Sequence, residues 1–315
     1  MHLGFIDLHG GTGRRFGSVG LALATPRLEF QIMPAETLTV EGADNTRIAY
    51  LVKAFDNQYH TRSHCNIRVQ QTIPAHKGLG SGTQTALAIG QGLAKLHNLD
   101  IADSEIAMHL GRGRRSGIGI HAFGQGGLLV DAGVKAGGMP TLIFRHPFPD
   151  RWRILLITRK GQDGLHGENE RYAFKQLPQF SKSCAGALSR TVLMKLMPSV
   201  IEQDFASFSQ AVHKLQNTMK DYFSSVEKQE VTTINSEGLL EYLSQQGIKG
   251  VGQTSWGPTV FAIMENQSQA EQLKAKLIDY MHATRQLDAA ISEPAETIGF
   301  SIVSGDNQGM VMVAD

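Results

Sequence analysis

The most informative segment is Pro74-Ala75-His76-Lys77-Gly78-Leu79-Gly80-Ser81-Gly82-Thr83-Gln84-Thr85-Ala86. Its glycines lie between an alternating strand pattern and an apolar-striped helix pattern. The first turn of a helix leaves backbone N–H groups unpaired, and the aligned peptide dipoles favour negative charge there. Glycines before that turn let a phosphate approach the backbone closely. Lys77 adds a positive charge at the mouth of the loop, and Ser81 with Gln84 fits a capping box. The stretch therefore predicts a phosphate-binding loop.

An ordinary strand–turn–helix, in which Ser81 is only a helix cap, is the competing interpretation of the same residues. The spacing is not the Walker pattern, because no Gly-Lys-Ser/Thr follows the glycines, and it is not the dinucleotide fingerprint either. The loop pattern taken alone leaves both interpretations open.

Strand and helix patterns intermingle on both sides of this loop, which favours an α+β or α/β architecture. In the first half, strand-like runs that we expect to form one early sheet cover residues 19–23, 28–32, 38–40 and 66–71. One helix is predicted from Asn45, a candidate N-cap, with Ile48, Leu51, Val52 and Phe55 on one face, and a second runs from just after Ser81 to about Leu96. In the second half we predict strands at 152–158, 259–264 and 298–303, and helices over roughly 186–197, 200–224, 236–246 and 267–282.

Bulk composition limits the class of protein. A chain of 315 residues favours two domains over one. Because 30 Lys+Arg face 29 Asp+Glu, the formal charge of +1 argues against a nucleic-acid-binding surface, and any anion site must be local. The longest apolar runs are too short to cross a membrane, and the first residues lack the pattern of a signal peptide. Cys65 and Cys184 have no CxxC spacing, as expected of thiols in a reducing compartment. We therefore expect a cytoplasmic protein whose partners are small molecules, with no nucleic acid and no membrane.

The loop closely resembles the second signature of the GHMP kinase superfamily, Pro-x-x-x-Gly-Leu-Gly-Ser-Ser, which embraces the phosphates of ATP. The later stretch Gly250-Val251-Gly252-Gln253-Thr254-Ser255-Trp256-Gly257-Pro258-Thr259-Val260 resembles the third, C-terminal signature of the same superfamily, and the order of the two agrees. The resemblance implies an α+β, GHMP kinase-like two-domain fold. It would place a ribosomal protein S5 domain 2-like domain at residues 1–155 and a ferredoxin-like domain at residues 156–315.

Two positions depart from the kinases of that superfamily. Such kinases commonly carry an aspartate shortly after a Ser-Gly pair, and here the pair Ser116-Gly117 is followed by Gly119 at that position. The loop has also lost its second serine, which is Gly82 in this chain. Phosphoryl transfer needs an oriented nucleophile and a held metal. Both changes argue against kinase chemistry, and neither argues against anion binding.

The segment Met1–Leu23 strongly resembles the opening of the β-ribofuranosylaminobenzene 5′-phosphate synthases, which share the GHMP fold. That resemblance implies a reaction of phosphoribosyl pyrophosphate with 4-aminobenzoate that forms a carbon–carbon bond and releases pyrophosphate and CO₂. The product would lead to tetrahydromethanopterin. The family further implies Mg²⁺ as cofactor and a homodimer. The sequence leaves open whether the acceptor is 4-aminobenzoate or 4-hydroxybenzoate.

Phosphoribosyl pyrophosphate is charged at both ends, so the resemblance implies at least two cationic clusters. Guanidinium groups bind phosphate and carboxylate in bidentate fashion. Arg14 and Arg15 follow one glycine turn, while Arg112, Arg114 and Arg115 occupy another. The catalytic candidates are Asp7, Arg15, Lys77 and Ser81, and Asp7 is also the candidate metal ligand, with a turn-capping carboxylate as its alternative role. The candidate substrate-binding residues are His9, Arg14, Gly78, Gly80, Gly82, Thr83, Arg112, Arg115, Ser116, His166, Glu168 and Ser255.

Weaker patterns carry alternatives. His60 and His64 are four residues apart, but no glutamate accompanies them and a strand follows, which argues against a metal site. His166 and Glu168 fit either an active-site loop or a solvated connection. At the level of function, an ATP-dependent small-molecule kinase and a phosphate-binding regulatory protein remain alternatives to the synthase.

Overall fold

The computed structural model describes residues 1–161, 163–164, 167–230, 236–254, 257–287 and 298–313. Its first sheet is antiparallel and has the strand order β1-β2-β6-β7. The strands are β1 (His2–Asp7), β2 (Gly17–Leu21), β6 (Leu128–Asp131) and β7 (Leu142–His146). All five residues of β2 and all four of β6 are buried, so these strands form the centre of the sheet and the loops at their ends can carry the site.

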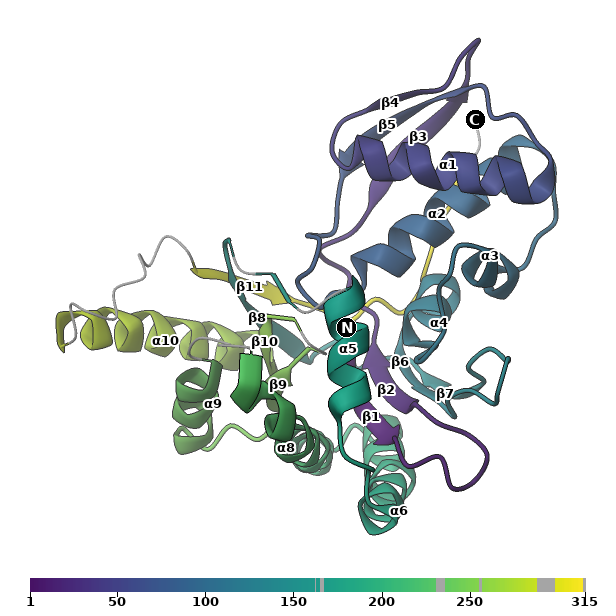
Figure 1. The fold of residues 1–315 in the computed structure, drawn as a ribbon. Helices are drawn as coiled ribbons and strands as arrows, with labels where there is room; N and C mark the ends of the chain where they lie inside the picture. The colour runs from purple at the N-terminus through teal and green to yellow at the C-terminus, as the bar shows by residue number, and fades with distance from the viewer. Residues whose placement is uncertain (162, 165–166, 231–235, 255–256, 288–297, 314–315) are drawn as a thin grey trace.

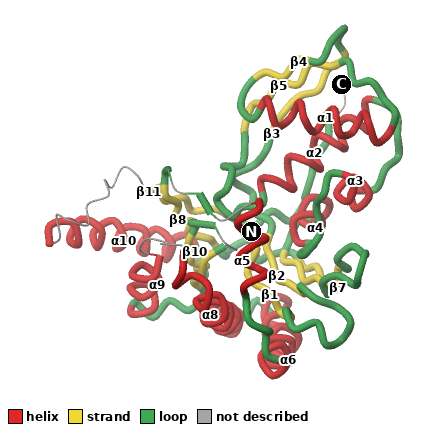
Figure 2. The backbone as a smooth tube through the Cα atoms, viewed as in Figure 1, coloured by secondary structure: helices red, strands yellow, loops and turns green. Residues whose placement is uncertain are grey.

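A separate three-stranded sheet has the order β3-β5-β4 and lies far from β1 and β2 (Figure 2). It consists of β3 (Glu29–Pro34), β4 (Thr39–Glu41) and β5 (Cys65–Gln71). The expectation of one early sheet is therefore wrong. The run at 19–23 corresponds to β2, which pairs with β1 and β6, because alternation along one strand does not specify its partner.

Two helices pack on the small sheet, α1 (Asn45–Tyr59) and α2 (Ser81–Leu96). The predicted apolar face of α1 is confirmed, since Ile48, Leu51, Val52 and Phe55 are each at most 3% exposed. Asn45 is the first residue of α1, while Asp44 occupies the N-cap position. Two short helices, α3 (Asp103–His109) and α4 (Ile118–Gln125), pack against α2 (Figure 1) and were absent from the sequence-based expectation.

The second half forms an antiparallel sheet with the strand order β11-β8-β10-β9. It contains β8 (Arg153–Arg159), β9 (Val251–Gln253), β10 (Val260–Met264) and β11 (Ile298–Val303). Several helices lie between β8 and β9, and the last two of them are α8 (Phe205–Glu230) and α9 (Ser236–Gln245), while α10 (Gln267–Leu287) separates β10 from β11. This β-α-β-β-α-β order with strand order 4-1-3-2 is the predicted ferredoxin-like arrangement.

Alternate residues of β8 enter two different cores, as the two-residue period of a strand requires. Ile154 and Leu156 join the largest cluster, which also contains Leu3 and Val130 of the first sheet. Leu155 and Ile157 face α9 and α10 in a second cluster. The first half and the second half thus share one hydrophobic core. The predicted domain boundary after residue 155 falls within β8, and the division into two domains stays a prediction.

Three further helices complete the described chain, namely α5 (Gly167–Gln176), α6 (Lys182–Thr191) and α7 (Met197–Ile201). The continuous helix predicted over residues 186–197 is instead divided by a π-helical turn at Val192–Leu196. Among the residues the structure describes, no helix is both long enough and apolar enough to pass through a membrane.

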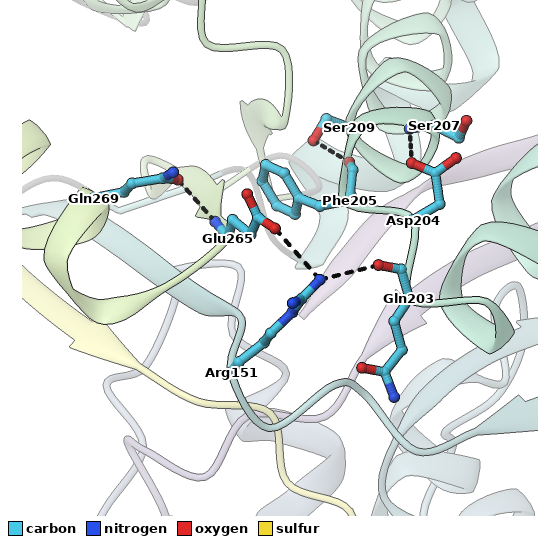
Figure 3. A network of polar contacts seen from close by, with 8 residues as sticks. All are labelled: Arg151, Gln203, Asp204, Phe205, Ser207, Ser209, Glu265 and Gln269. Carbon is cyan, nitrogen blue, oxygen red and sulfur yellow. Dashed lines mark hydrogen bonds and ion pairs between the residues drawn. The ribbon is translucent and has the colours of Figure 1, made fainter.

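A polar network joins the turns at one end of the second sheet (Figure 3). The Arg151 guanidinium donates to the backbone oxygen of Gln203 at 3.3 Å and pairs with the Glu265 carboxylate at 3.3 Å. The backbone N–H of Glu265 donates to Oε1 of Gln269, in α10, at 3.3 Å. Because the Arg151 and Glu265 side chains are 54% and 39% exposed, the ion pair contributes about 0–1 kcal/mol and aligns the turns more than it stabilises them.

Candidate anion-binding site

The glycine loop ends at a helix N-terminus, as predicted, but the capping box is wrong. Gly80 is the N-cap of α2, with a left-handed φ of 78° and no side-chain cap, and Ser81 is the first helical residue. The Gln84 side chain does not reach back to the cap; its Nε2 donates to the backbone oxygen of Gly119 at 2.6 Å. Glycine starts this helix because its backbone adopts the left-handed conformation without steric cost. Gln84 thereby ties α2 to α4.

Two of the first four backbone N–H groups of α2 lack a hydrogen-bond acceptor among the described residues. The backbone N–H groups of Thr83 and Gln84 both donate to the Gly80 oxygen at 3.1 Å. For Ser81 and Gly82, the described residues provide no acceptor for the backbone N–H. These two unpaired amides lie at the positive end of a helix of 16 residues, where an anion is stabilised.

Two arginines approach this helix end from different elements. A Cβ built on Gly82 would lie 3.0 Å from Nη2 of Arg47, on α1, and 3.1 Å from Nη1 of Arg112, in the turn after α3. Burial and, secondly, the neighbouring Arg47 charge lower the pKa of Arg112. Within the described part of the chain neither guanidinium has a carboxylate partner, and Nε of Arg112 is buried without a hydrogen bond. The two side chains therefore leave excess positive charge beside the open amides.

A cavity of about 680 Å³ adjoins Arg112 and brings together the N-terminal motif and the second arginine cluster. Its cationic lining comes from three separate turns of the chain, and among the described residues no aspartate or glutamate lines it. The residues lining it are His9, Gly10, Gly13, Arg14, Arg15, Met108, Arg112, Gly113, Arg114, Val134, Lys135, Ala136, Gly137, Gly138 and Met139. A site with this charge is suited to a multiply charged anion.

The turn after β1 presents the first of these arginines. Oδ1 of Asp7 accepts the backbone N–H of His9 at 2.7 Å and that of Gly10 at 3.1 Å, so the carboxylate caps the turn. Nε of Arg15 donates to the Leu8 oxygen at 2.9 Å, and Nη1 of Arg14 donates to the Gly133 oxygen at 3.1 Å. These bonds fix both arginines while leaving other guanidinium N–H groups for a ligand.

Asp131 holds two walls of this cavity in place. Its Oδ2 accepts the Ser18 hydroxyl at 2.6 Å and the Gly117 amide at 2.9 Å, while Oδ1 accepts the Gly133 amide at 2.8 Å. Burial raises the pKa of Asp131, and the hydrogen bonds from Ser18, Gly133 and Gly117 act in the opposite direction. The carboxylate is fully buried at the end of β6 and thus joins the turn before α4 to the turn that leads to Lys135. These hydrogen bonds hold the backbone near Arg114 and near Lys135, two of the residues that line the cavity.

The two signatures predicted from the GHMP resemblance pack directly on each other. The hydroxyl of Thr254 donates to the Lys77 oxygen at 3.4 Å, and a Cβ on Gly257 would lie 2.6 Å from the Gly78 Cα. Gly78 itself has a φ of +74°, and a Cβ there would lie 2.5 Å from the backbone oxygen of Thr254. The close backbone approach explains why both positions are glycine.

We expect Gly78→Ala to lower the free energy of unfolding by about 2 kcal/mol or more, because strain at positive φ adds to a backbone collision. Gly247→Ala is the matched control, since Gly247 has a φ of +75° but no atom within 4 Å of its Cβ position. The control should lose only about 1 kcal/mol. Equal losses for the two variants in chemical denaturation would show that the contact between the signatures contributes nothing.

Other candidates from the sequence lie outside the cavity lining. Nζ of Lys77 pairs with the Asp163 carboxylate at 3.3 Å. Nη1 of Arg115 pairs with Glu170 at 2.7 Å, and Cζ of Arg115 lies 4.2 Å from the ring centroid of Phe174. Ser116 hydrogen-bonds Ser18 and donates to Asp131, so it belongs to the positioning network.

The remaining candidates divide between exposed and undescribed positions. The Glu168 side chain is 93% exposed and pairs with Arg171 at 3.4 Å. The candidates His166 and Ser255 lie outside the described residues. Across the described ranges, no three His, Cys, Asp or Glu side chains are grouped as metal ligands. His60 is the C-cap of α1.

Comparison with known proteins decides the family. The sequence pattern of the GHMP kinases N terminal domain matches residues 46–127, and that of the GHMP kinases C terminal domain matches residues 196–283. The β-ribofuranosylphenol 5′-phosphate synthase of Archaeoglobus fulgidus is 32% identical over 89% of this chain and 90% of its own. The chain belongs to this synthase family. The enzyme of the same name from Methanocaldococcus jannaschii is 32% identical over 83% of this chain and 86% of its own.

Solved structures agree on the fold. Mevalonate diphosphate decarboxylase from Staphylococcus aureus superposes with a TM-score of 0.66 at 11% identity, covering 98% of this chain and 94% of that one. At this identity the likeness concerns architecture alone. This protein therefore has the predicted α+β, GHMP kinase-like fold.

Three residues of the candidate site were not predicted from the sequence. Arg47 was not predicted because no pattern along the chain links it to residues 82 and 112. Only the packing of α1 beside α2 brings it close to them. Asp131 had a local signature, namely one carboxylate at the end of the apolar run Leu128-Leu129-Val130. Lys135 lies in the glycine-rich segment 133–138, whose turn character was also readable.

Proposed function

We propose that this protein condenses phosphoribosyl pyrophosphate with 4-hydroxybenzoate or 4-aminobenzoate, releasing pyrophosphate and CO₂. The observation that carries the proposal is the position of Arg112, which lines the basic cavity and also lies beside the open amides of α2. Two anion subsites are therefore contiguous. A substrate with a phosphate at one end and a pyrophosphate at the other fits such a pair.

The proposal assigns each end of the donor to one subsite. Pyrophosphate takes the amides of Ser81 and Gly82 beside Arg112, where positive charge is fixed before the reaction begins. The 5′-phosphate takes the cavity with Arg14, Arg15 and Arg114. Arg115 has no part in this assignment, because Glu170 already neutralises it.

In the proposed reaction, the main task of the protein is to stabilise the negative charge that develops on the departing pyrophosphate. The bond between ribose C1′ and the pyrophosphate oxygen breaks, and the bonding electrons leave with pyrophosphate. The benzoate ring carbon that bears the carboxylate then bonds to C1′, and loss of CO₂ returns its bonding electrons to the ring. Because no ring proton is removed, no base is needed, in agreement with Gly119 at the position where kinases hold an acid. Preorganised donors at the leaving group supply the largest catalytic contribution.

Mg²⁺ belongs to the proposal as an ion that enters with phosphoribosyl pyrophosphate. The described residues offer no cluster of three protein ligands, which fits an ion that keeps water and substrate phosphates as ligands. Oδ1 of Asp7 is used by the turn, so its second oxygen is the candidate contact. The ion would supply charge neutralisation to the phosphates.

The product for which the relatives are named, a ribofuranosylphenol 5′-phosphate, favours 4-hydroxybenzoate as acceptor, since decarboxylation of that acid at the bonded carbon leaves a phenol. Incubation with phosphoribosyl pyrophosphate, Mg²⁺ and carboxyl-labelled 4-hydroxybenzoate or 4-aminobenzoate tests the proposal. We expect labelled CO₂ and pyrophosphate in equal amounts, with the higher kcat/KM for 4-hydroxybenzoate. ADP formation from ATP and a hydroxylated acceptor, without CO₂ release, would support the kinase alternative instead.

A further inference from the structure

Arg47 has no place in the motifs from which the function was inferred, yet it reaches the same helix end as Arg112. It lies in the first turn of α1, which begins at Asn45. Its Nη2 and Nη1 of Arg112 are 3.0 Å and 3.1 Å from one point, the Cβ position of Gly82. Two guanidinium groups thus converge where residue 82 has no side chain.

The convergence of two cations is unfavourable without a ligand. Like charges close together repel, most strongly where water is partly excluded. Burial and the neighbouring Arg47 charge both lower the pKa of Arg112, as expected for a cation beside a second cation. Within the described residues no carboxylate neutralises either side chain. Because the described residues do not balance this charge, the geometry is that of a site completed by an anion.

Gly82 is what makes room for the pair. A larger residue at this position would place its Cβ against both guanidinium groups. The glycine and the two arginines therefore act together: the guanidinium groups of Arg47 and Arg112 occupy the space that a side chain at residue 82 would fill. Each guanidinium offers donors in a fixed fork, which suits neighbouring phosphoryl oxygens better than a point charge does.

We propose that Arg47 is a second pyrophosphate ligand and forms with Arg112 a guanidinium clamp that selects a diphosphate over a monophosphate. Each phosphoryl group of a diphosphate receives one guanidinium, while the amides of Ser81 and Gly82 bind the same anion from the helix end. A monophosphate can engage only part of this donor set. The proposal rests on the proposed function only in naming pyrophosphate as the leaving group.

Calorimetric titration of the full-length protein with inorganic pyrophosphate, and separately with orthophosphate, tests the clamp. We expect wild-type protein to bind pyrophosphate at least about tenfold more tightly than orthophosphate. Arg47→Ala should weaken pyrophosphate binding by about tenfold or more and orthophosphate binding much less. Arg47→Lys keeps the charge but loses the fork, so it should restore only part of the affinity.

Lys53→Ala is the matched control, because it removes one positive charge from an exposed position of the same helix. It should leave pyrophosphate affinity within about twofold of wild type. Gly82→Ser is an independent variant that should also weaken pyrophosphate binding, since its side chain takes the space of the guanidinium groups. Circular dichroism melts establish that each variant is folded.

Pyrophosphate affinity of Arg47→Ala within about twofold of wild type would overturn the clamp. The test of the clamp and the test of the proposed reaction can give different answers. Arg47-dependent pyrophosphate binding without CO₂ release would uphold the clamp and overturn the proposed reaction. CO₂ release with pyrophosphate binding that is insensitive to Arg47 would do the reverse.

Discussion

Arg112→Ala lowers kcat/KM for phosphoribosyl pyrophosphate by about 10²–10³-fold, the loss expected when one preorganised donor to developing negative charge is removed. The effect should be this large because Arg112 borders both anion subsites, whereas Arg14 and Arg114 border one. Part of the loss should be in kcat, since charge on the departing pyrophosphate grows toward the transition state. Initial rates of labelled CO₂ release over a range of donor concentrations measure both parameters.

Arg27→Ala provides the control for that measurement. The Arg27 side chain is 62% exposed and pairs with Glu29 at 2.9 Å, and it does not line the cavity. Its replacement should leave kcat/KM within about twofold of wild type. If Arg112→Ala were equally mild, Arg112 would have no part in stabilising the leaving group.

Asp131→Ala lowers the free energy of unfolding by about 3 kcal/mol and the melting temperature by roughly 5 °C. The reason is that the donors now satisfied by this buried carboxylate, including the amides of Gly117 and Gly133, would be left without an acceptor. Asp131→Asn should recover only part of the loss, because its amide retains one acceptor oxygen and turns an NH₂ group toward donors. Denaturant unfolding followed by circular dichroism measures these free energies.

A surface carboxylate gives the comparison for Asp131. Glu265→Gln weakens the ion pair with Arg151 shown in Figure 3, whose side chains are 39% and 54% exposed, and should cost less than about 1 kcal/mol. If Asp131 positions the cationic turns, its replacement should also affect substrate binding. Asp131→Asn should weaken phosphoribosyl pyrophosphate binding although the residue does not line the cavity, whereas Glu265→Gln should not. Unchanged affinity in a folded Asp131→Asn protein would reduce Asp131 to a purely structural residue.

Several local features of this protein were determined by its sequence. The helix that starts at Ser81 and the buried face of α1 follow from apolar spacing, which acts between residues three or four apart. The glycines at 78 and 80 follow from backbone conformations with φ of +74° and +78°, which disfavour other residues. The family resemblance of the N-terminal segment and of the two glycine signatures also predicted the ferredoxin-like second sheet. It made Arg14, Arg15 and Arg112 candidates in two separate clusters, and only the structure shows that they line one cavity.

Contacts between groups that are far apart along the chain could not be predicted from the sequence. Gln84 bonds Gly119 rather than its own helix cap, and β2 joins β1 and β6 rather than β3, because competing partners come from remote parts of the chain. Arg47 meets Arg112 and Gly82 only because α1 and α2 pack on the same small sheet. A sequence specifies periodicity and backbone preference residue by residue, whereas the charge of a site is summed over whatever side chains packing brings within a few ångströms.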